Sequence, residues 1–197
     1  MNRIILASGN PDKLEELRWL LGGLEVEVVP VRGIIPDWKV EETGATLEEN
    51  AYLKARDVVR RTGMPAVADD TGLFVDILGG APGVYAARFA GFDCTYENNI
   101  QKLLRTMLCE RNRTASFMTS AVFVSSDIEF SVTGEIRGVI LEEPDGDSGF
   151  GYDPVFLPDG LDHTFGRCTA EEKNRISHRA LALRSLREKL MGSGFLD

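Results

Sequence analysis

The stretch RIILASGNPDK, residues 3–13, predicts a β-strand, a tight turn and the start of an α-helix in immediate succession. Its opening RIILA is a short, β-branched apolar run that is typical of a buried strand. Asn10 suits the N-cap position of a helix, and Pro11 suits the first helical position, where its missing N–H costs no hydrogen bond. The chain is therefore expected to open with a strand that feeds directly into a capped helix.

Strands and helices of the same kind follow along the rest of the chain. EVEVV (25–29) alternates as a half-buried strand, and residues 114–140 are rich in strand formers that predict antiparallel hairpins. Gly22-Gly23 is expected to end the first helix, and a capping box at Thr46–Glu49 is expected to open a second helix that runs to about Arg61. The run PAVAD (65–69) predicts a short strand. A further helix is expected to be capped by Thr95, with apolar positions Ile100, Leu103, Leu104, Met107 and Leu108, and a last helix is expected to end near Met191. This mixed order indicates an α/β or an α+β fold.

Composition limits the class of protein. The chain has 197 residues, 43% of them hydrophobic, which suits one globular domain or two closely joined lobes. The net charge of −9 disfavours a sequence-independent grip on a nucleic-acid backbone. The three cysteines, Cys94, Cys109 and Cys168, are odd in number, share no metal-ligand spacing and are interpreted as reduced thiols. Since there is neither a long apolar run nor a signal-peptide core, we expect a cytoplasmic protein with no membrane partner.

The turn SGNPDK (Ser8 to Lys13) is a candidate phosphate site. The first N–H groups of a helix lack intrahelical partners and carry partial positive charge, so that a phosphate binds there favourably. Lys13 lies in the first helical turn and is able to reach the same anion. The pattern is not a Walker loop, which is longer and ends in Gly-Lys-Ser/Thr. A plain capped turn is the alternative interpretation.

Acidic residues suggest a metal site. Asp69 and Asp70 follow a short apolar strand, where neighbouring carboxylates are costly unless a cation neutralises them. In extended chain they point to opposite sides, so one of them can hold Mg²⁺ while the other orients or deprotonates water. The alternative is an Asx-turn with solvated acids. EETG (41–44) adds two more acids; the alternative interpretation is a solvated loop. Asn50 and Lys54 share one face of a helix; the alternative there is a solvated polar stripe.

Two further clusters complete the pattern. Lys173, His178 and Arg179 would form a cationic pocket if the chain breaks between the first two, with Ser177 capping a fresh helix; an ordinary basic helix surface is the alternative. The run GDSGFGYDP (146–154) combines glycines, which permit positive φ, with aromatic rings able to stack on a planar base and an acid able to accept from its ring N–H groups. A tight turn with core aromatics is the alternative there. Together, the clusters are what a magnesium nucleotide requires.

The sequence also resembles the inosine/xanthosine triphosphate pyrophosphatase family, which hydrolyses deaminated purine nucleoside triphosphates. The matching segments keep the family's order and cover nearly the whole chain: ILASGNPDK (5–13), EETGATLEENAYLKA (41–55), ADDTGLFVDILGGAPGVYAARFAG (68–91), GFGYDPVF (149–156) and EEKNRISHRALAL (171–183). Ser8 and Thr71 stand where the family often has Thr and Ser, which keeps a hydroxyl at both positions. The stretch FGRCTAEEK (165–173) matches less well.

The resemblance implies an ITPase-like α/β fold: one domain over residues 1–197, with two lobes around a long mixed sheet with flanking helices and a substrate cleft between the lobes. It also implies a homodimer that depends on Mg²⁺. Carried over by position, Asp70 is the general base and a metal contact, with Glu42 as a metal ligand and Asp69 close by. The implied phosphate-binding residues are Ser8, Gly9, Asn10, Lys13, Lys54, Thr71 and Lys173, and the implied base-binding residues are Phe150, Gly151, Tyr152, Asp153, His178 and Arg179.

The expected reaction is hydrolysis of ITP, dITP and XTP to the nucleoside monophosphate and pyrophosphate, which would cleanse the nucleotide pool. Two alternatives remain. One is a pyrophosphatase for other modified nucleotides. The other is a nucleotide-binding regulator without turnover, which the three acids disfavour, because mere binding of a polyanion favours fewer negative groups.

Overall fold

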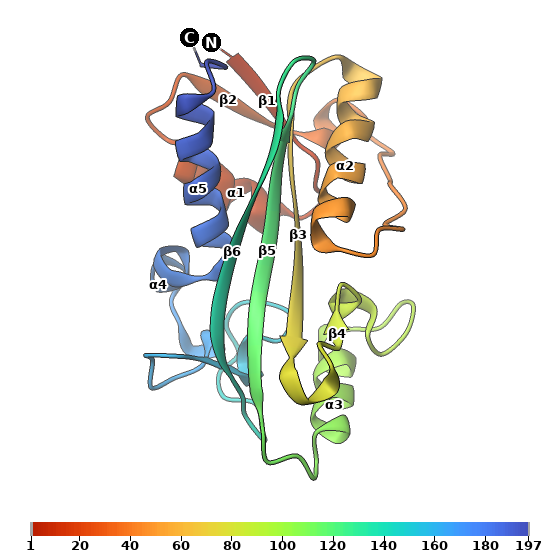
Figure 1. Cartoon of the computed structure of the whole chain (residues 1–197), viewed down its shortest axis with the longest axis vertical. Coiled ribbons are helices and arrows are strands. Elements are labelled where there is room, and N and C mark those ends of the chain that lie inside the picture. Colours follow the sequence, from red (N-terminus) through yellow and green to blue (C-terminus); the bar gives the residue numbers. More distant parts are fainter. Residues whose placement is uncertain (1, 197) are drawn as a thin grey trace. The chain divides into compact units, whose positions relative to one another are not determined.

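The computed structural model describes residues 2–196, and both helices and strands occur along this range (Figure 1). The elements are β1 (Asn2–Leu6), α1 (Pro11–Leu21), β2 (Val26–Pro30), α2 (Leu47–Thr62), β3 (Ala66–Val75), β4 (Pro82–Gly83), α3 (Tyr96–Thr106), β5 (Thr114–Val124), β6 (Glu129–Ile140), β7 (Phe156–Pro158), α4 (Ala170–Ile176) and α5 (His178–Gly192). None of the helices between residues 2 and 196 has the length and apolar character needed to cross a bilayer.

The strands form a mixed sheet in the order β2-β1-β3-β5-β6-β7, with β4 paired to β3. β1 runs parallel to both β2 and β3, whereas β4 is antiparallel to β3 and β7 is antiparallel to β6. β5 and β6 are neighbours joined by a short turn in which Ser125 N donates to Ile128 O (2.8 Å). The prediction of an α/β fold with a mixed sheet is confirmed, and the hairpin expected within residues 114–140 is one pair of long strands.

The chain divides into two compact units. The first contains the residues up to Asp70, Thr119–Gly134 and the residues from Arg179 on, and the second contains Thr71–Met118 and Glu135–His178. β3, β5 and β6 each contribute residues to both units.

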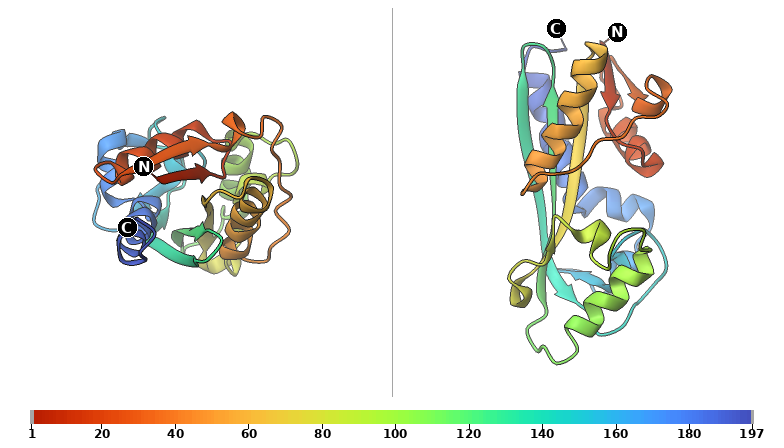
Figure 2. Two further views of the ribbon diagram at one scale, coloured as in Figure 1. Left: turned by 90° about the horizontal axis from the view of Figure 1, so that it is seen from above. Right: turned by 90° about the vertical axis from the view of Figure 1, so that its right-hand side faces the viewer.

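Helices cover both faces of the sheet in the first unit (Figures 1 and 2). Ile4 belongs to a core with Leu17 of α1 and Leu186 of α5, whereas its neighbour Ile5 belongs to a second core with Ala55 of α2. Successive strand residues point to opposite faces, so a continuous apolar run is required where both faces are buried. This is why the opening RIILA carries no polar alternation. The two ends of the described chain meet here, where Asn2 Nδ2 donates to Phe195 O (2.9 Å).

The helix starts of the first unit follow from their capping residues. Asn10 caps α1 by accepting from Asp12 N (2.9 Å), and Thr46 caps α2 by accepting from Glu49 N (3.1 Å). The predicted capping box at α2 differs in one bond. The Glu49 carboxylate accepts from Ala45 N (2.6 Å), one residue before the N-cap, instead of from the backbone N–H of Thr46. A carboxylate there still interacts favourably with the helix dipole.

The second unit has its own core. It joins Leu73 and Val75 of β3, Ile100 and Leu103 of α3, Phe117 of β5, and three aromatic residues that follow β6 in the chain, Tyr152, Phe156 and Phe165. Leu108, expected on the apolar stripe of α3, is instead 82% exposed and lies beyond the end of the helix at Thr106. Met107 is the C-cap of α3, so Leu108 lies outside the helix and does not continue its apolar stripe.

Candidate active site

The two adjacent acids lie within a strand rather than after one. β3 does not end at Asp69, as the sequence predicted, but continues to Val75. Leu73 and Phe74 pair with β4 and extend the strand, while Ala66 and Val67 pair with β1, so the acids lie between these two pairings. Asp69 is 3% exposed and Asp70 is 9% exposed, which makes the alternative of an Asx-turn with solvated acids wrong.

Asp69 belongs to a buried charge cluster with α1 and α5. Its carboxylate Oδ2 lies 2.7 Å from Lys13 Nζ and 3.2 Å from Arg179 Nε, and Arg179 Nη1 reaches Glu16 Oε2 at 2.8 Å. Burial by itself raises the pKa of Asp69, but the charges of Lys13 and Arg179 outweigh it and hold that pKa far below its ordinary value. Burial lowers the pKa of Lys13. With two cations and two carboxylates, the cluster is balanced in charge.

Asp70 belongs to a different cluster, with α2. Lys54 Nζ lies 3.0 Å from Asp70 Oδ1 and 2.9 Å from Glu42 Oε1, and Asn50 Nδ2 donates to Asp70 Oδ2 (3.2 Å). Asn50 is fully buried and Lys54 is 8% exposed, so these residues do not form a solvated stripe. Here one ammonium faces two carboxylates.

The pKa shifts in this cluster reflect its charge balance. Burial raises the pKa of Asp70 and Glu42 raises it further, while Lys54 opposes both. Burial lowers the pKa of Lys54, but Asp70 and Glu42 together outweigh it and raise that pKa. The two shifts have different causes: burial outweighs the nearby ammonium at Asp70, whereas the two carboxylates outweigh burial at Lys54. Among these three groups, one ammonium faces two carboxylates.

This imbalance decides which acids fit a divalent cation. Glu42 and Asp70 offer hard carboxylate oxygens, the donors that Mg²⁺ prefers, in a place where two carboxylates face one ammonium. Asp69 is already neutralised by two cations, and within the described residues the three acids do not bring their oxygens within 4.8 Å of one another. The residues present fit a metal held by Glu42 and Asp70, and the structure does not add Asp69 to that set.

The turn before α1 is well defined. Ser8 Oγ accepts from Asn10 N (3.2 Å), and Asn10 caps the helix. Gly9 lies against a residue that sequence reasoning missed: a Cβ at this position would lie 2.9 Å from Arg32 Nη2. Arg32 follows β2 without any motif around it, so no local pattern signals its position beside the turn.

The glycine-rich run of the second unit is organised by Asp153. This residue is 2% exposed, and its Oδ2 accepts from Phe150 N (2.8 Å) and forms an ion pair with Lys173. Lys173 Nζ also lies 4.6 Å from the centre of the Phe150 ring. The expectation of two rings that stack on a base is corrected for Tyr152, which is 3% exposed and whose OH donates to Ala86 O (2.9 Å), because packing in the core covers its faces.

The last cationic residues are separated by a break in the helix, as predicted. α4 ends at Ile176, Ser177 is extended (φ −66°, ψ 157°), and α5 begins at His178. The common cationic pocket stays a prediction. Lys173 pairs with Asp153, and His178 is stacked on Phe117 with ring centres 4.6 Å apart. Arg179 pairs with Asp69 and Glu16.

Comparison with known proteins identifies the family. A family model described as the Ham1 family matches residues 4–189. The chain belongs to the Ham1 family. A protein of Thermoanaerobacter pseudethanolicus named dITP/XTP pyrophosphatase is 44% identical over 191 residues, covering 96% of both chains. Among solved structures, a HAM1 protein from Coxiella burnetii (TM-score 0.92, 38% identity) and the Ham1 protein of Staphylococcus aureus (TM-score 0.91, 36% identity) each match 98% of this chain and 100% of their own.

Sequence reasoning missed some residues that surround the candidate site of this Ham1-family chain. Glu16 completes the Asp69 cluster, but on α1 it looks like any acid on a solvated helix face. Phe117 and Phe165 pack around His178, with ring centres 4.6 and 6.3 Å away. Phe117 lies in the β-rich region and Phe165 lies in the stretch that matches the family less well, so neither carried a signal beyond its apolar character.

Proposed function

We propose that this Ham1-family chain hydrolyses deaminated purine nucleoside triphosphates (ITP, dITP and XTP) to the monophosphate and pyrophosphate. Relatives that are 43–44% identical over almost the whole chain are named dITP/XTP pyrophosphatase, which supports this choice of substrate. The observation that carries the chemistry is the Asp70–Lys54–Glu42 cluster, in which one buried ammonium faces two carboxylates.

The first unit supplies groups for the triphosphate. Lys54 is buried and positively charged beside Asp70, and Lys13 is held by Asp69 in the first turn of α1. The turn of Ser8, Gly9 and Asn10 presents the start of α1, where the dipole of the helix favours an anion. We propose Thr71 and Lys173 as further contacts to the phosphates.

Asp70 acts as the general base in this proposal. Burial raises the pKa of its carboxyl, so it is a stronger base than an exposed aspartate and accepts a proton from the attacking water more readily. Asn50 and Lys54 each engage one of its oxygens, which fixes its orientation. Mg²⁺ held by Glu42 and Asp70 would supply neutralisation of the phosphate charge and acidification of bound water. Lys54 would hold the two carboxylates in place for it.

The second unit supplies groups for the base. Phe150 offers a ring for stacking, and Lys173, held by Asp153, is positioned beside that ring. Inosine and xanthosine carry a carbonyl at C6 where adenosine carries an amino group, so a donor aimed at this oxygen would reject adenine, because it stays unpaired against an amino group. We propose that backbone N–H groups near Gly151 and the side chain of His178 provide such donors.

We further propose that the protein is a cytoplasmic homodimer, as the family resemblance implies. The mass of the protein in solution, measured by light scattering, tests this; a monomer at micromolar concentration would contradict it.

The activity is tested with a panel of ITP, XTP, dUTP, GTP and ATP in the presence of Mg²⁺, with detection of pyrophosphate. We expect ITP and XTP to be cleaved fastest. Preference for dUTP would instead indicate a pyrophosphatase for other nucleotides, and tight binding of ITP without release of pyrophosphate would indicate a regulator.

The role of Asp70 is tested by Asp70→Asn, which keeps the shape of the side chain. We expect turnover to fall by at least roughly 10²–10⁴-fold, because the base is lost, while nucleotide binding remains measurable. The matched control is Asp76→Asn, which removes only an exposed ion pair with Arg137 and should leave turnover nearly unchanged. Near-normal turnover by Asp70→Asn would refute the assignment.

A further inference from the structure

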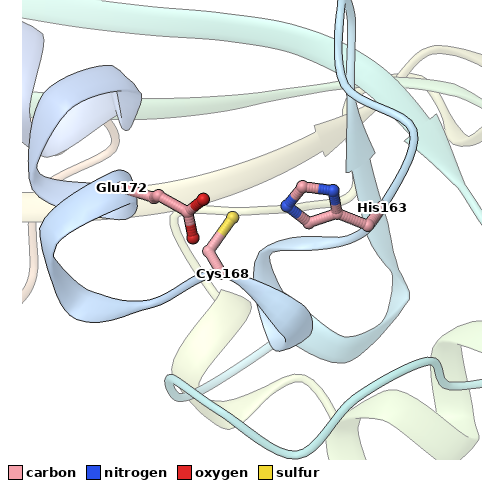
Figure 3. Close-up of side chains that lie close together, drawn as sticks. All are labelled: His163, Cys168 and Glu172. Carbon is pink, nitrogen blue, oxygen red and sulfur yellow. The ribbon is translucent and has the colours of Figure 1, made fainter.

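Three metal-ligating side chains of different chemistry gather in the second unit, around the start of α4 (Figure 3). His163, Cys168 and Glu172 each offer one ligand atom, and these atoms all lie within 4.8 Å of one another. In the described range 2–196, this is the one group of three such residues with that spacing. None of the three belongs to the nucleotide site proposed above. We propose that these three side chains bind a zinc ion. This zinc site does not depend on the proposed activity.

His163 has the arrangement of a metal ligand. One of its ring nitrogens is turned toward Cys168 and Glu172, and the other is turned away (Figure 3). The nitrogen turned away is Nδ1, which lies 2.7 Å from Asp162 Oδ1. Metal-binding histidines usually donate their second ring N–H to a carboxylate, which fixes the tautomer and the ring orientation. Asp162 therefore leaves the lone pair of Nε2 directed at the other two ligands.

Glu172 is fixed by helix capping. Its Oε2 accepts from Thr169 N (2.8 Å) and from Thr169 Oγ1 (2.9 Å), as part of the capping box of α4. Both of these bonds end on Oε2, so they leave Oε1 out of the capping box. The carboxylate is thus held in place before any ion arrives, which reduces the entropy lost on binding.

Cys168 supplies the soft ligand. It is 4% exposed, whereas Glu172 is exposed and His163 is half-buried, so an ion reaches the thiol from the side of these two residues. Binding would replace the S–H bond by a sulfur–metal bond and release the proton to water. A buried thiolate without a cation is costly, so the ion and the thiolate stabilise each other.

The donor set selects the metal. Thiolate, imidazole and carboxylate together are ligands of Zn²⁺, whereas Mg²⁺ takes oxygen ligands. Zinc bonds of about 2.0–2.3 Å in a tetrahedron place ligand atoms ~3.3–3.8 Å apart, so the three side chains need to close by at most roughly 1–1.5 Å. Three protein ligands leave the fourth position to water.

The position of the site links it to the rest of the second unit. The ion would join the loop that contains His163 to the first turn of α4. The residue after Glu172 is Lys173, which forms the ion pair with Asp153 and lies beside Phe150. Zinc would therefore stabilise the segment that holds Lys173 in place.

The test is metal titration of the full chain after removal of metals with a chelator. With Co²⁺ as the probe, we expect a thiolate-to-cobalt charge-transfer band in the near ultraviolet that saturates near one equivalent per chain. Zn²⁺ should displace the band and Mg²⁺ should not. Zn²⁺ at about 100 times its Kd should also raise the unfolding temperature by roughly 5 °C or more.

Matched variants decide which residues hold the ion. Glu172→Gln keeps an acceptor for the capping box but removes the carboxylate ligand, and it should weaken the band strongly, as should His163→Gln and Cys168→Ser. Glu171→Gln and Cys109→Ser, which change exposed residues of the same types, should keep it. The absence of a band in the unchanged chain, or a band that survives Cys168→Ser, would overturn the proposal. If Cys168→Ser does not fold, an unchanged affinity in both Glu172→Gln and His163→Gln would overturn it equally.

Discussion

The buried charge cluster around Asp69 makes a quantitative prediction about stability. Asp69→Asn keeps the size of the side chain but removes the charge that neutralises Lys13 and Arg179, at 2.7 and 3.2 Å. Removal of one partner from a buried ion pair typically costs about 3–5 kcal/mol, because the other charge stays buried without compensation. Since Arg179 retains Glu16 at 2.8 Å, we expect the lower end, about 3 kcal/mol. For a chain of this size the unfolding temperature should fall by roughly 6–12 °C.

The assay is urea unfolding at pH 7, followed by circular dichroism, with an exposed pair as control. Glu27→Gln breaks the ion pair with Arg3, whose side chains are 46% and 62% exposed, and should cost less than about 1 kcal/mol. Both variants replace a carboxylate by an amide, but Asp69 faces two buried cations and Glu27 faces one exposed cation. A loss of less than about 1 kcal/mol for Asp69→Asn, equal to that of the control, would refute the reasoning.

The same substitution makes a prediction about pH. The pKa of Asp69 is held far below its ordinary value in the folded chain, so its charge contributes stability above the unfolded pKa of about 3.9. This contribution is lost as pH falls toward the folded pKa. The difference in unfolding free energy between the unchanged chain and Asp69→Asn should therefore be full at pH 7 and shrink steadily below about pH 4. A difference that stays constant down to pH 2.5 would contradict the assigned shift.

Two further substitutions have matched controls. In urea unfolding, Gly149→Ala should destabilise the chain by about 1–3 kcal/mol more than Gly151→Ala. Both glycines have positive φ (77° and 66°), so the backbone strain is similar in the two variants. Only the new Cβ at position 149 would lie against Asp153, 2.1 Å from Oδ2, and break the hydrogen bond that this oxygen accepts from Phe150 N. Equal losses would show that Asp153 can move at no cost. Phe123→Ala, at a fully buried position, should lower the free energy of unfolding by about 3–5 kcal/mol. Phe92→Ala, at a position 91% exposed, should change it by no more than about 0.5 kcal/mol. A loss below about 1 kcal/mol for Phe123→Ala would contradict the packing described.

Local chemistry made much of the fold predictable. Asn10 and Thr46 mark helix starts because their side chains accept backbone N–H groups within a few residues, and such bonds form wherever the segment lies in the fold. The break at Ser177 was predicted from a different premise, that Lys173 and His178 reach one ligand, because one unbroken helix would direct them to different faces. The end of β3 was not predictable, because its last residues are held in the strand by pairing with β4, and the Pro82–Gly83 pair that forms β4 carries no strand signal of its own.

The sequence by itself determined the family, the α/β class and which residue types are available for chemistry, because these depend on the order of residues and on interactions within a few positions. Only the tertiary structure decided the charge environment of each acid. Asp69 and Asp70 are neighbours in the chain, yet the first is neutralised by Lys13 and Arg179 and the second shares one lysine with Glu42. The physical reason is that a strand directs adjacent side chains to opposite faces, and helices from different parts of the chain cover these faces.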